Sequence, residues 1–313
     1  MGTEKMIIGG VTAADNRHNE EQLTKKEEAA IKYLKTIAAK YQPLFLAYSG
    51  GKDSEVILHL ATKAKIDFTP FYNNTTIDPP GTLSYIKKKE IIMVMQPRKN
   101  FFSLIEHRGL PSTFQRFCCD KLKERFVGRY IIVGVRKSES MKRNQRYQEP
   151  EQCRIYKSGQ RGIVIMPILY WTDSDIENYI HKEKIQCHPL YYDNTGTFHV
   201  ERRLGCLACP LRYDRGKKDF IRYPKLVRAW CRALAVYRNT RPTLTKSISH
   251  FNDEYENFYK NVFLRNMEEL NSLRDRPEGF DARKELMNYF GIQLPPPQSP
   301  LNRIKQRLQC TTR

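Results

Sequence analysis

A run of six residues between Ser49 and Ser54 has the residue types of a phosphate-binding loop. A glycine pair lets the backbone approach an anion closely, while a lysine and two serines add a positive charge and hydroxyl donors. An apolar run, residues 44–48, precedes the loop, and a helical pattern, residues 55–64, follows it. The spacing differs from that of a Walker loop. A tight strand–helix turn with a fortuitous lysine is the alternative, but the full hexapeptide favours phosphate binding by Ser49, Gly50, Gly51, Lys52, Asp53 and Ser54.

Four of the eight cysteines are spaced as a candidate ligand set, with an adjacent pair followed at long range by a Cys-x-x-Cys pair: Cys118, Cys119, Cys206 and Cys209. Four thiolates are the number that a [4Fe–4S] cluster takes. Zinc is a weaker alternative, because structural zinc sites usually use two spaced pairs and adjacent residues reach tetrahedral angles poorly. Free thiols are the third interpretation. A disulfide framework is not expected in a cytoplasmic chain.

The charge of the chain indicates a polyanionic partner. The formal net charge is +20, and a field of that sign attracts nucleic acid and phosphorylated substrates. Between Val200 and His250 thirteen Lys or Arg face three acids, so this segment alone carries +10. Aromatic residues are interleaved with these charges, as on surfaces that bind phosphates and stack bases: Tyr213, Phe220, Tyr223, Trp230 and Tyr237. The alternative is an amphipathic helix whose aromatic side chains face the core.

The elements that must position the loop and the cysteines are short apolar runs that alternate with helical segments up to about residue 215. The apolar runs are residues 44–48, 68–72, 91–95, 130–135 and 163–165. Such alternation is typical of a parallel sheet with helices on both faces, which binds ligands beyond the carboxyl ends of its strands. We therefore expect an α/β fold with a doubly wound, mainly parallel sheet and the 49–54 loop at its binding edge.

Helical segments flank this core on both sides. Residues 20–40 have apolar positions at helical spacing, and the basic, aromatic segments 225–237, 254–273 and 282–290 also read as helices. The sequence thus predicts three parts: a helical lead (1–40), a nucleotide-binding core with the cluster ligands (41–215), and a helical basic C-terminal region with a mobile tail (216–313). No apolar run reaches the length of a membrane span and the first residues lack a signal-peptide stretch, so we expect a cytoplasmic protein without a membrane partner.

The hexapeptide resembles the pyrophosphate loop (PP-loop) of the ATP pyrophosphatase superfamily, whose fold is adenine nucleotide alpha hydrolase-like. Other segments resemble the phosphoadenosine phosphosulfate (PAPS) reductase family. Residues 116–123 resemble its R-x-C-C-x-x-L-K segment, and residues 134–143 resemble its G-x-R-x-x-E-S-x-x-R segment. Further matching segments follow in the family's order up to about residue 212: Met166-Pro167-Ile168 with Trp171, Asp175 and Tyr179, then Pro189-Leu190-Tyr191 and Gly205-Cys206-Leu207-Ala208-Cys209.

The resemblance implies roles for individual residues. The 49–54 loop would hold the nucleotide phosphates, the backbone of Tyr72, Asn73 and Asn74 would contact adenine, and Arg136 and Arg143 would hold anionic substrate groups. Lys52, Asp53, Arg136 and Arg143 form the candidate catalytic set. The family's iron–sulfur branch uses the same tandem cysteine pair plus Cys-x-x-Cys. The implied cofactors are ATP or an adenylyl sulfate-type nucleotide, Mg²⁺ and a [4Fe–4S] cluster.

Three functions are compatible with these features. The first is a sulfurtransferase that activates nucleic acid (DNA or tRNA) by adenylation, as the DNA phosphorothioation branch of the family does, with a sulfur donor such as a cysteine desulfurase as partner. The second is a sulfonucleotide reductase, whose nucleophile lies in a terminal Glu-Cys-Gly-Leu-His-like motif; here Cys310 has the position but lacks the Gly-Leu-His part. The third is a non-enzymatic nucleotide- or nucleic-acid-binding module. The basic segment favours the first.

Overall fold

The computed structural model describes residues 13–112, 114–212, 216–240, 253–264 and 279–297. They belong to two compact units that interleave along the chain. A sheet unit comprises Met1–Asn74, Pro79–Gln96 and Arg125–Gly205, and a helical unit comprises Thr75–Asp78, Pro97–Glu124 and Cys206–Arg313. These units differ from the three consecutive parts expected from the sequence. Two segments inside the expected core, Thr75–Asp78 and Pro97–Glu124, make their contacts within the helical unit.

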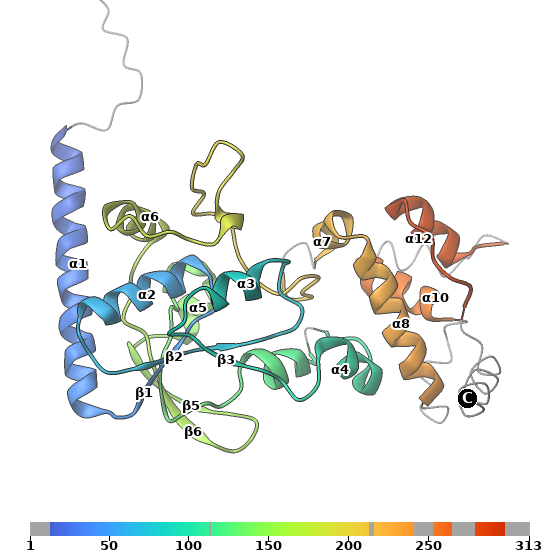
Figure 1. Cartoon of the computed structure of the whole chain (residues 1–313), viewed down its shortest axis with the longest axis horizontal. Helices are drawn as coiled ribbons and strands as arrows, with labels where there is room; N and C mark the ends of the chain where they lie inside the picture. The colour runs from blue at the N-terminus through green and yellow to red at the C-terminus, as the bar shows by residue number, and fades with distance from the viewer. Residues whose placement is uncertain (1–12, 113, 213–215, 241–252, 265–278, 298–313) are drawn as a thin grey trace, which may run out of the picture. The chain divides into compact units, whose positions relative to one another are not determined.

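The sheet unit contains six strands in the order β3-β2-β1-β4-β6-β5. Figure 1 labels β1, β2, β3, β5 and β6. Every neighbouring pair is parallel except β5 and β6, which are antiparallel. This arrangement confirms the predicted α/β fold with a mainly parallel sheet. The strands are β1 (Leu44–Ala47), β2 (Thr69–Asn73), β3 (Met93–Met95), β4 (Tyr130–Ile132), β5 (Glu151–Ile155) and β6 (Arg161–Ile165).

The strand order reverses direction at β1, which is where such sheets bind ligands. From β1 the chain adds β2 and β3 on one side, and then returns to add β4 on the other. Sheets of this kind bind ligands beyond the carboxyl ends of their strands, at such a switch point. Residues 49–51, which follow β1, lie at this switch point.

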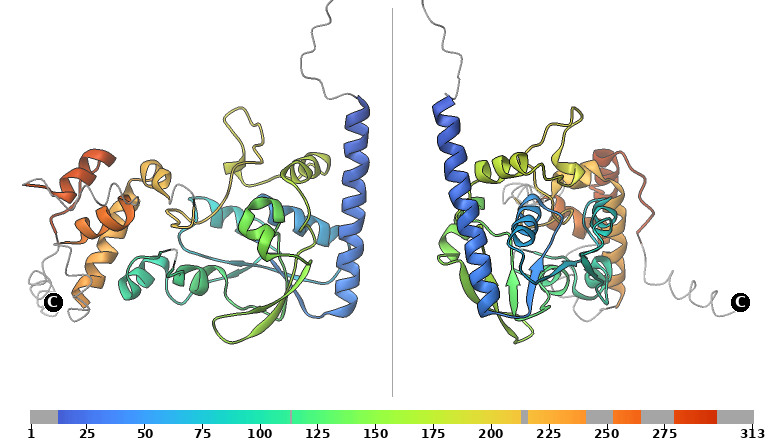
Figure 2. Two further views of the ribbon diagram at one scale, coloured as in Figure 1. Left: turned by 180° about the vertical axis from the view of Figure 1, so that it is seen from behind. Right: turned by 60° about the vertical axis from the view of Figure 1, so that its left-hand side comes forward.

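Three helices of the sheet unit pack together beside the sheet: α1 (Ala13–Lys40), α2 (Lys52–Lys63) and α6 (Asp173–Lys182) (Figure 2). The apolar positions of α1 at helical spacing are buried except for the partly exposed Ile31, and Leu34 and Ile37 are almost inaccessible. A buried carboxylate joins all three helices, because Glu27 of α1 pairs with Lys63 of α2 and Lys182 of α6. Shorter helices complete the unit: α3 (Thr82–Lys87), η2 (Lys137–Glu139), α5 (Met141–Arg146) and η3 (Pro189–Tyr191).

The helical unit is built around the aromatic core of α8 (Lys225–Thr240). Trp230 is fully buried and packs against Phe101 of α4 (Phe101–Arg108) and Phe258 of α10 (Glu254–Phe258). The unit also contains η1 (Cys119–Lys123), α7 (Lys217–Arg222), η5 (Tyr259–Phe263) and α12 (Ala282–Phe290). The described residues of the C-terminal region form helices joined by loops, and residues 291–297 follow the last helix without being helical. Among the described helices, none combines the length and the hydropathy needed to cross a bilayer.

Candidate functional site

The 49–54 loop is a tight turn that opens α2. Gly50 has φ +74°, in the left-handed region that glycine adopts without strain. Gly51 precedes the helix, and its carbonyl oxygen accepts hydrogen bonds from the Glu55 N–H (3.0 Å) and the Ser54 hydroxyl (2.7 Å). Because the first N–H groups of a helix lack partners within it, they and the helix dipole make this end of α2 a site for an anion.

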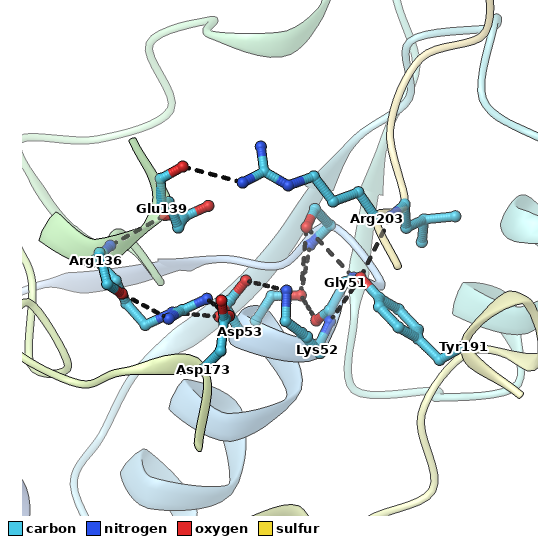
Figure 3. Close-up of polar contacts among 12 residues, drawn as sticks. Gly51, Lys52, Asp53, Arg136, Glu139, Asp173, Tyr191 and Arg203 are labelled. Carbon is cyan, nitrogen blue, oxygen red and sulfur yellow. Dashed lines mark hydrogen bonds and ion pairs between the residues drawn. The ribbon is translucent and has the colours of Figure 1, made fainter. Parts of the chain in front are cut away.

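Lys52 lies inside the loop rather than on the surface. Its side chain is buried, and its Nζ is 3.5 Å from Asp53 Oδ2. Its backbone N–H donates to the hydroxyl of Tyr191 over 3.2 Å, and that hydroxyl also accepts the N–H of Leu204 (Figure 3). Burial raises the pKa of Tyr191 to about 12, so the phenol stays protonated at neutral pH. The sequence placed Tyr191 only within a family segment, and the structure shows its contact with the loop.

Arg136 is a buried cation that holds Asp53 in place. Its side chain is 1% exposed. Its Nε donates to Asp53 Oδ1 at 2.7 Å and its Nη2 donates to Asp173 Oδ1 at 2.7 Å, while Nη1 donates to the Ser138 hydroxyl (Figure 3). These contacts engage every nitrogen of the guanidinium with protein atoms. In this structure Arg136 therefore positions the loop, and the contact with an anionic substrate group that the family resemblance implies stays a prediction.

Glycine is required where the loop after β4 approaches the same helix end. A Cβ at Gly134 would lie 2.8 Å from the carbonyl oxygen of Asp53. Real side chains do not tolerate such a contact, so any residue larger than glycine would force the loop after β4 or the start of α2 to move.

Glu139 connects Arg136 to two further cations. Its carboxylate accepts the backbone N–H of Arg136 at 3.1 Å and pairs with Arg143, whose side chain is 40% exposed. Its carbonyl oxygen accepts Nη2 of Arg203 at 3.0 Å. Arg143 lies within electrostatic range of both Arg203 and Asp53. The structure thus places Arg143 near Asp53 of the loop and adds Arg203, which nothing in the sequence marks except its basic neighbourhood.

The predicted adenine-contacting residues lie at the end of β2, next to β1 in the sheet. The side chains of Asn73 and Asn74 are buried and fixed by polar contacts. Arg125 Nη2 donates to Asn73 Oδ1 at 3.0 Å, and Asn74 Nδ2 donates to Gln96 Oε1 at 2.8 Å. Because a guanidinium can only donate, Arg125 fixes which end of the Asn73 amide is the oxygen. Tyr72 is buried beside them.

The four predicted ligand cysteines line one pocket in the helical unit. Its walls include Phe101 of α4, Leu122 and Lys123 of η1, and the segment from Thr75 to Ile77. The Leu207 N–H donates to the Ile77 carbonyl over 2.8 Å, which ties the Cys-x-x-Cys loop to that segment. Four thiols around a mostly apolar pocket match in number and type the ligands that a [4Fe–4S] cluster would need.

The thiols differ in their electrostatic surroundings. A hydrogen bond from Cys118, together with the nearby Arg116 guanidinium, outweighs burial and lowers the pKa of Cys119 to about 6. Burial raises the pKa of Cys206 to about 12. Among the residues that the structure describes, no three His, Cys, Asp or Glu side chains converge tightly enough to hold a metal ion. In a [4Fe–4S] cluster each thiolate binds its own iron, so the ligands surround a pocket instead of meeting at one point.

The two arginines should respond differently to neutralisation. Arg136→Met removes a fully buried cation and leaves Asp53 without its main partner, so we expect a loss of about 3 kcal/mol in the free energy of unfolding. Arg143→Met removes a half-exposed cation and should cost less than about 1 kcal/mol. Urea denaturation of the two variants measures both values. Equal losses would contradict the positioning role of Arg136.

Comparison with known proteins places this site in a family. Residues 43–212, more than half of the chain, match the phosphoadenosine phosphosulfate reductase domain. Two uncharacterized proteins of Methanocaldococcus jannaschii are 29% and 28% identical over 69% and 71% of this chain, and the matches cover 53% and 48% of their own lengths. The chain therefore spans about half the length of these relatives.

A named relative and a solved structure also match. Sulfate adenylyltransferase subunit 2 of Psychromonas ingrahamii is 27% identical over 53% of this chain and 66% of its own length. The PAPS reductase of Candida auris, solved as a phosphate complex, aligns with 63% of this chain and 96% of its own at 16% identity and a TM-score of 0.42. On the match over residues 43–212, the chain belongs to the phosphoadenosine phosphosulfate reductase domain family.

Proposed function

We propose that the chain is an ATP-dependent sulfurtransferase that acts on nucleic acid and carries a [4Fe–4S] cluster. The observation that carries the proposal is a buried, preorganised anion loop bordered by Arg143 and Arg203, in a chain of formal charge +20. Such a field would concentrate a polyanion around a nucleotide site. The family match supports an adenine nucleotide as the second substrate.

The proposed reaction has two displacements. A nucleic-acid oxygen attacks the α-phosphorus of ATP, the bond from that phosphorus to the bridging oxygen breaks, and pyrophosphate leaves. A sulfide-level donor, such as the product of a cysteine desulfurase with a thiol reductant, then attacks the activated atom, and AMP leaves with the original oxygen. Lys52 and the N–H groups that open α2 would stabilise the charge of the departing pyrophosphate. Mg²⁺ would accompany the phosphates, and Asp53 is the carboxylate that the loop offers.

Exposed cations on the helical unit support a nucleic-acid partner. On α8 the basic residues Lys225, Arg228 and Arg232 are exposed at spacings of three and four residues, so they share one face. The opposite side of the helix carries buried residues such as Trp230. Phe220 and Trp230 are core residues, as the alternative interpretation held, so their rings cannot stack on bases. The support for a nucleic-acid partner therefore comes from the exposed positive charges of α8.

The four cysteines would hold the cluster through their Sγ atoms, and bound iron and sulfide would supply electron-transfer or sulfur-handling chemistry. Lys123 lines the pocket and Arg116 Nη2 lies 3.7 Å from Cys119 Sγ, so both cations would offset the negative charge of thiolates. Zinc remains the competing occupant.

A sulfonucleotide reductase is the second candidate. The match to a PAPS reductase domain favours it. Its nucleophile would be Cys310, which lies outside the described residues. The third candidate, a module that only binds nucleotide or nucleic acid, would catalyse neither sulfur transfer nor sulfonucleotide reduction.

The cluster is tested by metal content. Protein purified without oxygen should be brown and contain about four irons per chain, as a [4Fe–4S] cluster requires. Serine substitution of any one of Cys118, Cys119, Cys206 or Cys209 should lower the iron content, whereas Cys153→Ser, an exposed cysteine of β5, should not. Stoichiometric zinc in anaerobic material would refute the proposal.

The two leading functions are separated by Cys310 and the basic face of the helical unit. In a nucleic-acid modifier, neutralising Arg222, Lys225 and Arg232 together should lower the slope of log affinity against log salt by about 0.7–0.9 for each phosphate that is no longer neutralised. Cys310→Ser should leave turnover intact. We choose Arg232 over Arg228, because Arg228 Nη2 donates to the Gln293 carbonyl and supports the fold. Sulfite release from a sulfonucleotide, abolished in Cys310→Ser, would establish the reductase instead.

A further inference from the structure

The short helix α5 contributes no buried side chain to the fold. A surface helix normally buries an apolar stripe against the core, but Met141 at its start is 80% exposed. Polar contacts at the two ends hold α5 instead. The Ser140 hydroxyl accepts the Arg143 N–H, and the Gln148 side chain donates to the carbonyls of Asn144 and Gln145. The outer surface of α5 is therefore not required for packing.

That surface carries only positive charge. The helix reads MKRNQR and contains three basic residues and no acid. Lys142 and Arg146, four residues apart, are exposed on one side of it. Two cation–aromatic pairs lie alongside: Lys137 Nζ is 5.1 Å from the ring centroid of Tyr170, and the Arg146 guanidinium is 5.3 Å from that of Tyr147.

Tyr170 is held in an exposed position. Its ring is 55% exposed, while its hydroxyl donates to the Gln148 carbonyl over 2.8 Å. A fixed, exposed aromatic ring beside a lysine, on a surface with further exposed cations, is the combination by which proteins bind the backbone of single strands and stack their bases.

The surface is connected to the nucleotide loop within the sheet unit. Glu139, two residues before the start of α5, pairs with Arg143 and accepts the backbone N–H of Arg136, and Arg136 in turn holds Asp53. A polyanion on α5 would therefore lie on the element that adjoins the phosphate site. A small sulfonucleotide would place its phosphates in the loop and would not need Lys142 or Arg146.

We propose that α5 together with Tyr170 is a docking surface for the phosphate backbone of a nucleic-acid strand, and that it presents the strand to the 49–54 loop. This inference rests on the proposed nucleic-acid function and goes further by naming a surface in the sheet unit, separate from the basic face of α8.

Fluorescence anisotropy with a labelled single-stranded oligodeoxynucleotide tests the surface over a range of salt concentrations. Lys142→Ala/Arg146→Ala should weaken binding at least about tenfold at low salt and lower the salt slope by about 1.4, since each phosphate of a single strand that a cation neutralises adds about 0.7 to it. Tyr170→Ala should weaken binding with little change of slope. The matched control is Lys157→Ala/Arg161→Ala, which removes two exposed positive charges from the β5–β6 hairpin of the same unit.

The outcomes separate the inference from the function on which it rests. Equal slopes for the α5 variant and the control, with normal binding by the wild-type protein, would overturn the docking surface and leave the proposed function standing. Failure of the wild-type protein to bind either single-stranded or duplex DNA or tRNA would overturn both. Calorimetry with a non-hydrolysable ATP analogue should give the same affinity for the α5 variant and the wild-type protein, and a weaker affinity of the variant would place Lys142 and Arg146 in the nucleotide site instead.

Discussion

The buried ion pair between Arg136 and Asp53 is the interaction on which the site depends. A fully buried guanidinium is unfavourable unless its donors are engaged, and here Asp53, Asp173 and Ser138 engage them. These partners come from the start of α2, the start of α6 and the loop after β4. Arg136 therefore holds the segments that follow β1 and β4 in fixed positions relative to each other, at the switch point of the sheet. The anion loop is consequently formed before any nucleotide arrives, and the cost of ordering it is met during folding.

The local features of this site could be predicted from sequence, because they depend on adjacent residues. The hexapeptide predicted a strand, a glycine turn and a helix, and the structure has β1, the left-handed Gly50 and α2 at these positions. The apolar runs predicted five of the six strands. β5 was missed because it is an edge strand with exposed Ile155 and Cys153, so it has no apolar run to detect.

The contacts among distant residues could not be predicted. Tyr191, Arg203 and Arg125 act on residues 52, 139 and 73 through contacts that span from 52 to 139 positions of the chain. Their own neighbourhoods, a family segment around Tyr191 and a basic stretch around Arg203, do not indicate these partners. Arg136 illustrates the same limit, since its motif indicates that a cation is needed without showing that its nitrogens contact Asp53, Asp173 and Ser138. The buried position of Trp230 in α8, by contrast, depends on local pattern, and helical periodicity alone already allowed it.

For the four candidate ligand cysteines, the local pattern could be predicted from the sequence and the long-range packing around them could not. Their spacing predicted one ligand set, and the structure places all four around a single pocket. The sequence did not indicate that the pocket belongs to the helical unit, because residues 97–124 join the C-terminal helices through the packing of Phe101 against Trp230. The segment from Tyr72 to Ile77 runs from the proposed adenine contacts directly into the wall of that pocket. Chain continuity thus links the two candidate sites whatever the arrangement of the units.

Under the proposed function, the 49–54 loop binds ATP for cleavage at the α-phosphorus. The most direct test incubates anaerobic protein with radiolabelled ATP, a polynucleotide and a sulfide source, and identifies the products by chromatography. We expect AMP and pyrophosphate in equal amounts, dependent on the polynucleotide and abolished in Lys52→Met, which keeps the length of the buried side chain but removes its charge. Formation of ADP and phosphate, or equal turnover by Lys52→Met, would contradict the claim.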